Sequence, residues 1–329
     1  MAIRIILELL YYRVMKKALL GFLLTSTLLL LIFLSFNIYL DVPRDEIEKK
    51  YVDESSKFMI LKDGSRIHYK DEGNKEGKVL VLVHGFADSL FTFDYMIPEL
   101  ENEFRLVRMD FPAFGLTGKV PSNNYGPEAF VKVIHEVTNN LGIQKFSIIG
   151  NSLGGSAAWR YALNYPEQLE GLILIAAAGI KNEEDKERKL APKAVNSPLT
   201  GWLFRYVMPK FMIGNILKNV FVDESLITSK NVDRFHDFLI LEGSREAIIS
   251  MSTSGGYKNN SKVEIRNITT PTLIIHGAND NIIPIRTHEY FLSEIVNSKA
   301  LIYDGVGHIP MLEAPIRTSK DIKEFMNGL

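Results

Sequence analysis

The distribution of apolar and polar residues divides the chain into a long apolar start and a body in which short apolar runs alternate with amphipathic stretches. Residues 18–40 carry no charged side chain. As a helix they would extend roughly 35 Å, against about 30 Å for the hydrocarbon core of a bilayer. Four basic residues precede this run: Arg4, Arg13, Lys16 and Lys17. The sequence therefore predicts one transmembrane helix, with residues 1–17 in the cytoplasm and the body on the other side of the membrane.

Two other interpretations of the apolar run stay open. A secretory signal peptide also begins with basic residues, but residues 18–40 exceed its usual apolar length and no A-x-A cleavage site follows. A buried helix of a soluble protein would be apolar as well. We expect an uncleaved signal anchor, which makes the membrane a partner of the chain and puts the body in the periplasm if the protein is bacterial. Cleavage would instead release a secreted protein.

The body shows the pattern of an α/β fold. Residues 41–56 are polar and typical of a linker, and "KFMILKDGSRIHYKDEG" then predicts a hairpin with Asp63 and Gly64 at its turn. Six apolar runs follow, most of them separated by helical patterns: "KVLVLVHG", "FRLVRMDFP", "FSIIG", "LEGLILIAA", "TPTLIIHG" and "KALIYDG". Strands that are apolar throughout are buried on both faces, so we expect a mostly parallel central sheet with helices on both of its faces.

The alternation stops once, over residues 179–266. This stretch contains helical patterns rich in aromatic residues and Met, and no strand run. It is too long for a loop, so the sequence predicts a helical cap over the end of the sheet. The cap divides the core into a first part at 57–178 and a second part at 267–329.

Composition excludes several classes of function. The chain has 329 residues, enough for one large α/β domain with an insert, and a formal net charge of −1. Binding of nucleic acid needs a basic surface, so no nucleic acid partner is expected. Because the chain has no cysteine, disulfides, thiolate nucleophiles and thiolate metal sites are ruled out. The histidines lack metal-ligand spacing, and we predict no metal or other cofactor.

The stretch "GNSLGG" is where chemistry is expected. A dinucleotide-binding loop needs glycine at the position of Ser152, and an acidic residue at the end of the next strand, which is absent. A nucleophile elbow needs a serine at a strained strand-to-helix turn with small neighbours. An apolar run precedes the serine, a helical pattern follows it, and Gly150, Gly154 and Gly155 supply the room. We therefore predict that Ser152 is a nucleophile.

A nucleophilic serine needs a base and a carboxylate that orients the base. In elbow enzymes these follow the serine in the order acid, then histidine, each just after a strand. "TLIIHGAND" places Asp280 in such a loop, and "ALIYDGVGH" does the same for His308. Asp110 also ends a strand run, but it precedes the serine and is expected to organise the following loop.

Two backbone N–H groups should bind the oxyanion. The residue after the nucleophile, Leu153, supplies one of them. Phe86, in the loop after "VLVLVHG", is expected to supply the other. His84 in the same loop is expected to brace the turn by hydrogen bonding.

With these motifs in place, the chain from about Phe58 to its C-terminus resembles the α/β-hydrolase family, in its serine esterase and lipase branch with a helical cap. The resemblance rests on "HGF", "DFPAFGLTG", "GNSLGG", "GANDNIIP" and "GVGHIPMLEAP". It implies Ser152 as nucleophile, His308 as base and then acid, and Asp280 as the orienting carboxylate. The chain departs from the family at Ala113, where relatives usually have Gly, and at His276, where many have Trp.

The function expected from this resemblance is hydrolysis of a carboxylic ester, from a small molecule or a lipid, through an acyl-enzyme. A carbon–carbon bond hydrolase of the same fold is the alternative within enzymes, although those relatives carry an aromatic residue directly after the base, where this chain has Ile309. A non-catalytic binding protein of the same fold is the alternative outside them. Whether water or an alcohol accepts the acyl group, the natural substrate and the oligomeric state all stay open.

Five large residues of the predicted cap fit either the lining of an acyl pocket or the cap's own core: Trp202, Phe204, Phe211, Met212 and Phe221.

Overall fold

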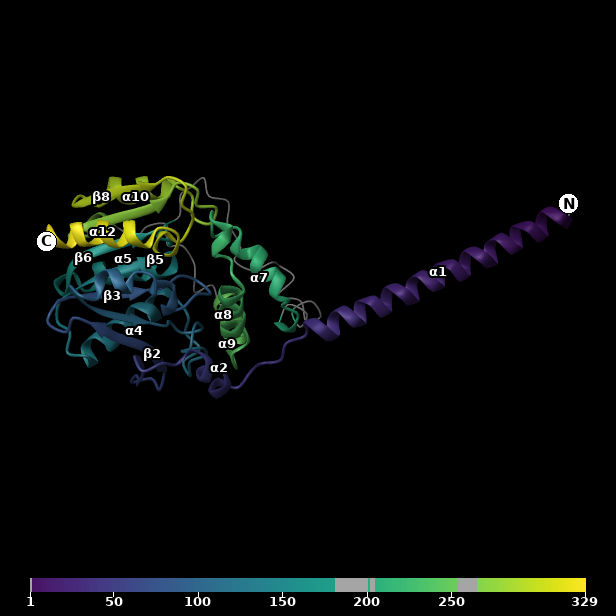
Figure 1. The fold of residues 1–329 in the computed structure, drawn as a ribbon, viewed down its shortest axis with the longest axis horizontal. Coiled ribbons are helices and arrows are strands. Elements are labelled where there is room, and N and C mark those ends of the chain that lie inside the picture. Colours follow the sequence, from purple (N-terminus) through teal and green to yellow (C-terminus); the bar gives the residue numbers. More distant parts are fainter. Residues whose placement is uncertain (1, 181–200, 202–204, 254–264) are drawn as a thin grey trace.

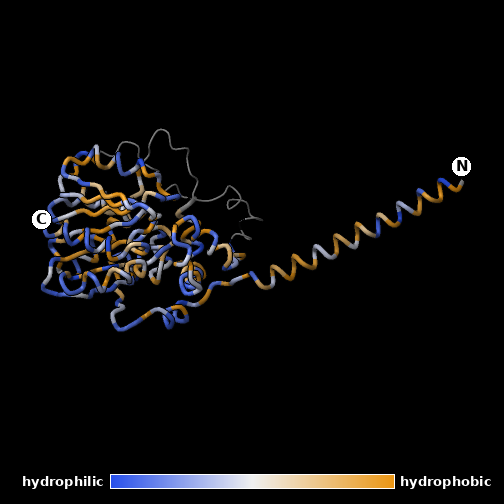
Figure 2. The backbone as a smooth tube through the Cα atoms, turned by 45° about the horizontal axis from the view of Figure 1, so that its top comes forward, coloured by the Kyte–Doolittle hydropathy of each residue, from blue (hydrophilic) through white to orange (hydrophobic). Residues whose placement is uncertain are grey.

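The computed structural model describes residues 2–180, 201, 205–253 and 265–329. It consists of a body and a single long helix, α1 (Ala2–Asn37), which extends away from the body (Figure 1). Helix α1 is apolar along most of its length, and its most apolar stretch makes no contact with the body (Figure 2). It therefore has the length and composition to cross a bilayer.

Helix α1 differs from the expected anchor at both ends. It begins near the N-terminus, so most of the predicted cytoplasmic segment, residues 1–17, is continuous with the apolar helix. It ends at Asn37, three residues before the predicted end of the span, because Ile38 leaves the helix to pair with Val207 as an isolated antiparallel bridge.

The body is built on one sheet of eight strands in the order β1-β2-β4-β3-β5-β6-β7-β8. The strands are β1 (Ser56–Ile60), β2 (Arg66–Gly73), β3 (Lys78–Val83), β4 (Phe104–Met109), β5 (Phe146–Asn151), β6 (Leu169–Ile175), β7 (Thr272–Gly277) and β8 (Ser298–Tyr303). β1 pairs antiparallel with β2, and β2 pairs antiparallel with β4, whereas all other neighbours are parallel. The predicted hairpin and the mostly parallel sheet are confirmed.

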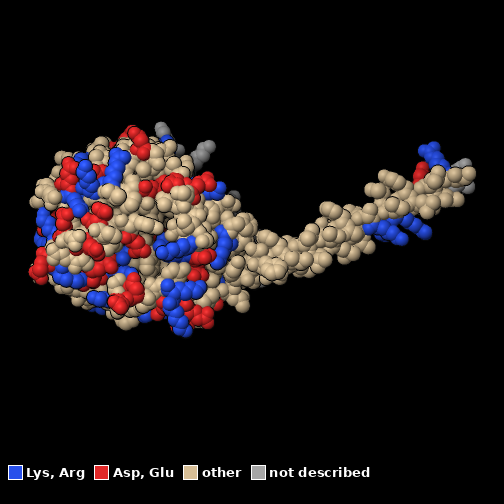
Figure 3. Space-filling model, in the orientation of Figure 1, with Lys and Arg blue, Asp and Glu red and all other residues tan. Residues whose placement is uncertain are grey.

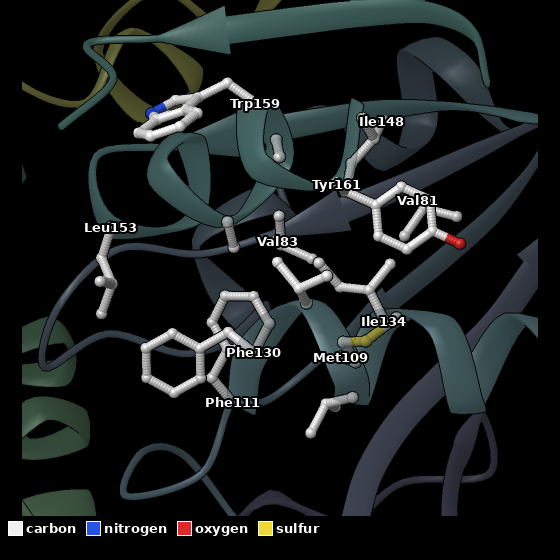
Figure 4. Packing of buried hydrophobic residues seen from close by; sticks show 14 of the residues in the cluster. Val81, Val83, Met109, Phe111, Phe130, Ile134, Ile148, Leu153, Trp159 and Tyr161 are labelled. Carbon is white, nitrogen blue, oxygen red and sulfur yellow. The ribbon is translucent and has the colours of Figure 1, made fainter. Parts of the chain in front are cut away.

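Both faces of the sheet are buried, as the apolar strands require. In β3 the side chains alternate: Val81 and Val83 join one apolar cluster, and Leu80 and Leu82 join another. Helices α4 (Pro127–Asn140) and α5 (Leu153–Asn164) cover the first face, where Trp159 and Tyr161 lie fully buried (Figure 4). α12 (Pro315–Asn327) covers the second face.

The remaining helices are short. They are α2 (Arg44–Tyr51), η1 (Leu90–Phe93), α3 (Ile97–Leu100), η2 (Pro166–Gln168), α7 (Lys210–Leu217), η4 (Glu224–Leu226), α8 (Ser229–Ile240), α9 (Ser244–Thr253), η5 (Ile265–Asn267), α10 (Arg286–Glu294) and α11 (Pro310–Glu313). Three of them, α7, α8 and α9, lie between β6 and β7 at the end of the body from which α1 leaves (Figure 1). The predicted cap, 179–266, falls here, and its residues 181–200, 202–204 and 254–264 lie outside the described part of the chain.

The segment at 41–56, expected as a linker, contains helix α2. Its charges suit a helix, because Asp45 and Glu46 lie in the first turn and Lys49 and Lys50 in the last, where the helix dipole favours them. Ile47 is fully buried and packs in a small apolar cluster with residues of the body, so tertiary contact fixes a helix that composition alone did not predict.

Ala113 adopts φ +80°, a left-handed conformation that favours glycine. We expect Ala113→Gly to raise the free energy of unfolding by about 1 kcal/mol, because glycine removes the strain around Cβ. Chemical unfolding of the full chain in detergent measures this change. Ala129→Gly, in the first turn of α4, is the control and should lower stability by at most about 1 kcal/mol, because glycine disfavours the helix. A destabilised Ala113→Gly would contradict this explanation.

Candidate active site

Ser152 lies at the turn between β5 and α5 with φ +51° and ψ −112°, a conformation that side chains other than glycine rarely adopt. The turn is held by backbone hydrogen bonds: the Ser152 N–H donates to Ile175 O (3.0 Å), and its carbonyl accepts from Ala178 N (2.9 Å). Both partners lie at the end of the neighbouring strand β6 or just after it. The serine is 7% exposed and stands at the positive N-terminus of α5.

The three glycines around this serine are needed because the backbone folds back on itself. A Cβ on Gly150 would lie 2.4 Å from the carbonyl oxygen of Gly154, and one on Gly154 would lie 2.2 Å from the carbonyl oxygen of Val83. A Cβ on Gly155 would lie 2.6 Å from the Cβ of Ala177. All three distances are shorter than any real contact, so the tight turn excludes side chains at these positions.

Asp280 and His308 meet at the ends of two neighbouring strands, β7 and β8. Asp280 Oδ2 lies 2.8 Å from His308 Nδ1. The other carboxylate oxygen, Oδ1, accepts hydrogen bonds from the N–H groups of Ile282 (2.7 Å) and Ile283 (2.9 Å). Burial on its own would raise the pKa of Asp280, but the His308 contact and these two N–H groups outweigh it and hold the pKa below its ordinary value. Asp280 is therefore a carboxylate at neutral pH.

The histidine loop is bonded to the serine turn through Asn151. Its side-chain Nδ2, one residue before the serine, donates to the backbone carbonyl of His308 (3.2 Å) and to that of Ile175 (3.2 Å). Ser152 and His308 are thereby brought to one edge of the sheet, both buried, although no hydrogen bond joins the hydroxyl to the imidazole. Such bonds are often long in unliganded enzymes and tighten when substrate binds.

The loop after β3 passes directly beside the serine. A Cβ built on Gly85 would lie 3.3 Å from the Cβ of Ser152. Phe86 follows in this loop and is half-buried. Within the described chain the backbone N–H groups of Phe86 and Leu153 donate to no acceptor, so both are available to an oxyanion.

His84 braces this loop and is not part of the Asp280–His308 pair. Its Nε2 accepts from the N–H of Phe111 (3.0 Å), so the ring proton is on Nδ1, which donates to the carbonyl of Gly85 (2.7 Å). Asp110 is likewise structural. It is fully buried and accepts from Leu90 N (2.7 Å) at the start of η1 and from Leu116 N (2.8 Å) in the loop after β4, so it joins these two segments.

Sequence reasoning missed two polar residues at the site. Asn151 is one, and the only signal for it was its position inside "GNSLGG". Glu313 is the other: its Oε1 accepts from Gly307 N (2.8 Å), and its Oε2 accepts from Val222 N (2.8 Å) and Asp223 N (3.2 Å). Glu313 therefore joins the loop that carries His308 to the segment that follows α7.

His276 is buried next to the acid. Its Nε2 lies 3.2 Å from the carbonyl of Ile283 and 3.4 Å from Asp280 Oδ2. Burial lowers the pKa of His276 and outweighs the attraction of the Asp280 charge, so the ring is neutral at pH 7 and donates to Ile283.

The cap lies closely over the loop after β3. A cavity of only about 10 Å³ is lined by Ala87 and Asp88 of that loop, and by Phe238 and Leu239 of α8, among others. This volume holds one water at most, so the loop and α8 are packed closely against each other here.

The five large cap residues divide into three groups. Phe221 is buried in the core, Phe211 and Met212 are exposed on the outside of the cap, and Trp202 and Phe204 lie outside the described residues. Neither Phe211 nor Met212 is enclosed in a pocket in this conformation, and their place in an acyl pocket stays a prediction. No cluster of side chains able to hold a metal ion occurs among the residues that the structure describes.

The comparison with protein families identifies the fold. Residues 78–315 match the model of the alpha/beta hydrolase fold, which covers most of the chain. The chain belongs to the alpha/beta hydrolase fold family. The match includes the serine turn, the acid loop and the histidine loop.

Known relatives are hydrolases of two kinds. Lipase 3 of Moraxella sp. (strain TA144) is 27% identical over 293 residues, which cover 86% of this chain and 88% of the lipase. The 2-hydroxy-6-oxo-6-(2'-aminophenyl)hexa-2,4-dienoic acid hydrolase of Metapseudomonas resinovorans is 25% identical, covering 82% of this chain and 89% of the relative. The solved structure of a meta-cleavage product hydrolase from Pseudomonas fluorescens IP01 is 25% identical and matches with a TM-score of 0.70, covering 83% of this chain and 97% of that one.

The neutral state of His276 predicts a pH dependence of stability. Because its folded pKa is depressed, the unfolded chain binds a proton below about pH 6.5 that the folded chain does not, so stability falls as the pH falls through that value. His276→Gln keeps a donor for Ile283 but cannot bind this proton. We expect its melting temperature to fall less than that of the native protein between pH 7.5 and 5.5. Equal losses in the two proteins would contradict the buried, neutral ring.

Proposed function

We propose that this protein is a serine hydrolase that cleaves carboxylic esters through an acyl-enzyme. The observation that carries the proposal is the Asp280–His308 pair, joined at 2.8 Å and bonded through Asn151 to the turn that bears Ser152. Serine, acid and histidine at the carboxyl ends of three parallel strands of one sheet, β5, β7 and β8, are the arrangement that such chemistry needs.

In the proposed mechanism the Ser152 hydroxyl oxygen attacks the ester carbonyl while His308 Nε2 takes the hydroxyl proton. Asp280 accepts from Nδ1–H, which keeps Nε2 free to act as the base and stabilises the imidazolium. The N–H groups of Phe86 and Leu153 bind the oxyanion. When the intermediate collapses, the bond to the leaving alcohol breaks and His308 returns the proton to it. Water, activated by the same histidine, then releases the acid and restores the serine.

Esters are favoured over carbon–carbon bonds as the substrate. Lipase 3 shares slightly more identity with this chain than the carbon–carbon hydrolase relative does, and Ile309 follows the base where such hydrolases carry an aromatic residue. The adjacent apolar cap favours a hydrophobic acyl group, and a membrane-bound enzyme has lipid esters within its reach. Hydrolysis of a carbon–carbon bond remains the second candidate, because that relative covers the same length of chain.

We further propose that α1 is retained as an uncleaved anchor. The residues just after it are integrated into the body: Tyr39 N donates to Tyr206 O (2.9 Å), and Arg245 donates to the carbonyl of Tyr39 (2.7 Å) and to the carboxylate of Asp41 (3.0 Å). Cleavage at the end of the apolar run would remove or disturb these contacts. With four basic residues before the apolar run, the body lies outside the cytoplasm.

Ser152→Ala should lower turnover of a p-nitrophenyl ester by at least about 10⁴-fold, because the nucleophile is lost. Asp280→Asn should lower this turnover by a similar factor, because the histidine loses its orientation. Steady-state kinetics in detergent measures both. Ser147→Ala is the matched control, since this buried hydroxyl of the same strand has no hydrogen-bond partner and its loss should leave turnover unchanged. Ester turnover retained by Ser152→Ala would refute the mechanism. Activity on a vinylogous diketone with none on esters would favour the second candidate.

Retention of α1 predicts that the mature protein sediments with membranes after a carbonate wash and still carries its N-terminal peptide. Mass spectrometry of the membrane fraction, with a C-terminal tag for capture, tests this directly. A soluble product that begins near residue 40 would identify a cleaved signal instead.

A further inference from the structure

Helix α7 presents an apolar face that nothing in the described chain covers. Phe211 is 59% exposed, Met212 38% and Ile216 56%. These positions share one side of the helix, whereas Ile213 and Leu217 point to the core and are buried. A helix only eight residues long thus carries large apolar side chains on both its inner and its outer side.

The exposed face lies next to the end of α1. Ile38, directly after α1, pairs with Val207, and α7 begins at Lys210, three residues later. Figure 1 shows α7 at the side of the body from which α1 leaves, and in Figure 3 an uncharged surface continues from α1 onto the adjoining part of the body. The apolar run of α1 ends within a few residues of this junction, so the membrane surface is expected at the level of α7.

We propose that the outer face of α7, formed by Phe211, Met212 and Ile216, inserts into the surface of the same bilayer that α1 spans. This inference rests on the proposal that α1 is a retained anchor. The occupant is a lipid surface because the patch continues the apolar surface of α1. Lys210 and Lys218 frame the helix, but each is paired with a carboxylate, Asp233 at 2.6 Å and Glu224 at 2.8 Å, so the apolar side chains would carry the binding. Three side chains are too small an area for a stable protein dimer.

Contact between α7 and the membrane would reach the candidate active site through the segment that follows α7. The residue three positions after α7, Val220, accepts a hydrogen bond from the His308 N–H (2.9 Å), and Glu313 holds Val222 and Asp223 to the same loop. α7 therefore lies between the bilayer and the loop that carries the base. Lipid contact at α7 would place the loop of His308 close to the bilayer from which an ester substrate would come.

The absence of cysteine from the chain makes the insertion measurable. Met212→Cys and Ile216→Cys, each labelled with the environment-sensitive dye NBD, are compared in full-length protein reconstituted into phosphatidylcholine and phosphatidylglycerol vesicles. Val296→Cys is the control, because this residue is 93% exposed and follows α10, a helix that lies in the part of the body away from α1 (Figure 1). Insertion predicts blue-shifted emission at 212 and 216, with quenching by lipids spin-labelled on the acyl chain, and neither effect at 296.

Emission at 212 and 216 that matches 296 would overturn the proposal. A blue shift that lipid quenchers do not change, and that disappears when the protein is diluted in the bilayer, would also overturn it. That result would identify a second copy of the chain as the occupant of the α7 face. These readouts do not depend on turnover, so they stand even if the proposed ester hydrolysis fails. If α1 is cleaved, loss of the N-terminal peptide identifies that failure separately.

A kinetic comparison tests the consequence for activity. The double variant Phe211→Ser with Ile216→Ser should hydrolyse a long-chain ester embedded in vesicles about tenfold more slowly, because weaker insertion lowers the access of the site to lipid. A tenfold change corresponds to roughly the free energy of burying one side chain. Its turnover of a short water-soluble ester should stay unchanged. Leu292→Ser with Val296→Ser, a matched pair of exposed apolar residues in and just after α10, should change neither rate. Equal loss on both esters would contradict a role in membrane contact.

Discussion

The reversal of the backbone at Ser152 is the constraint on which the rest of the site depends. It places a non-glycine residue at positive φ, and it can form only because Gly150, Gly154 and Gly155 carry no Cβ where neighbouring atoms lie within 2.4, 2.2 and 2.6 Å, respectively. The turn directs the serine side chain away from the sheet at the N-terminus of α5. The strands on either side of β5 run parallel to it, so the loops that follow these strands lie at the same edge of the sheet.

Hydrogen bonds between loops turn this shared edge into a site. Asn151 joins the serine turn to the histidine loop, and Asp280 holds the imidazole from the next strand end. Glu313 then continues the network outward by binding the segment that follows α7. The loop that carries His308 is therefore hydrogen-bonded both to the core, through Asn151, and to the segment that follows α7, through Val220 and Glu313. If the outer face of α7 contacts the bilayer as we propose, this connection links that contact to the position of His308.

Much of this arrangement could be predicted from the sequence because its signals are local. Strands buried on both faces are apolar throughout, and a serine among glycines between a strand and a helix leaves few other interpretations. Asp280 and His308 were found by their positions after strand runs. In contrast, α2 forms because Ile47 packs against distant residues, and the exposure of Phe211 depends on which side of α7 meets the core. Such contacts join segments far apart in the chain, and no local pattern encodes them.

The central claim is that one serine of this chain becomes covalently acylated. Reaction of the full-length protein with a fluorophosphonate, followed by peptide mass spectrometry, tests it most directly. The account predicts a single phosphonyl group on the peptide that contains Ser152, formed quickly in the native protein and slowly when His308 is replaced by Gln. An unlabelled protein, or a label on any other residue with Ser152 unmodified, would contradict it.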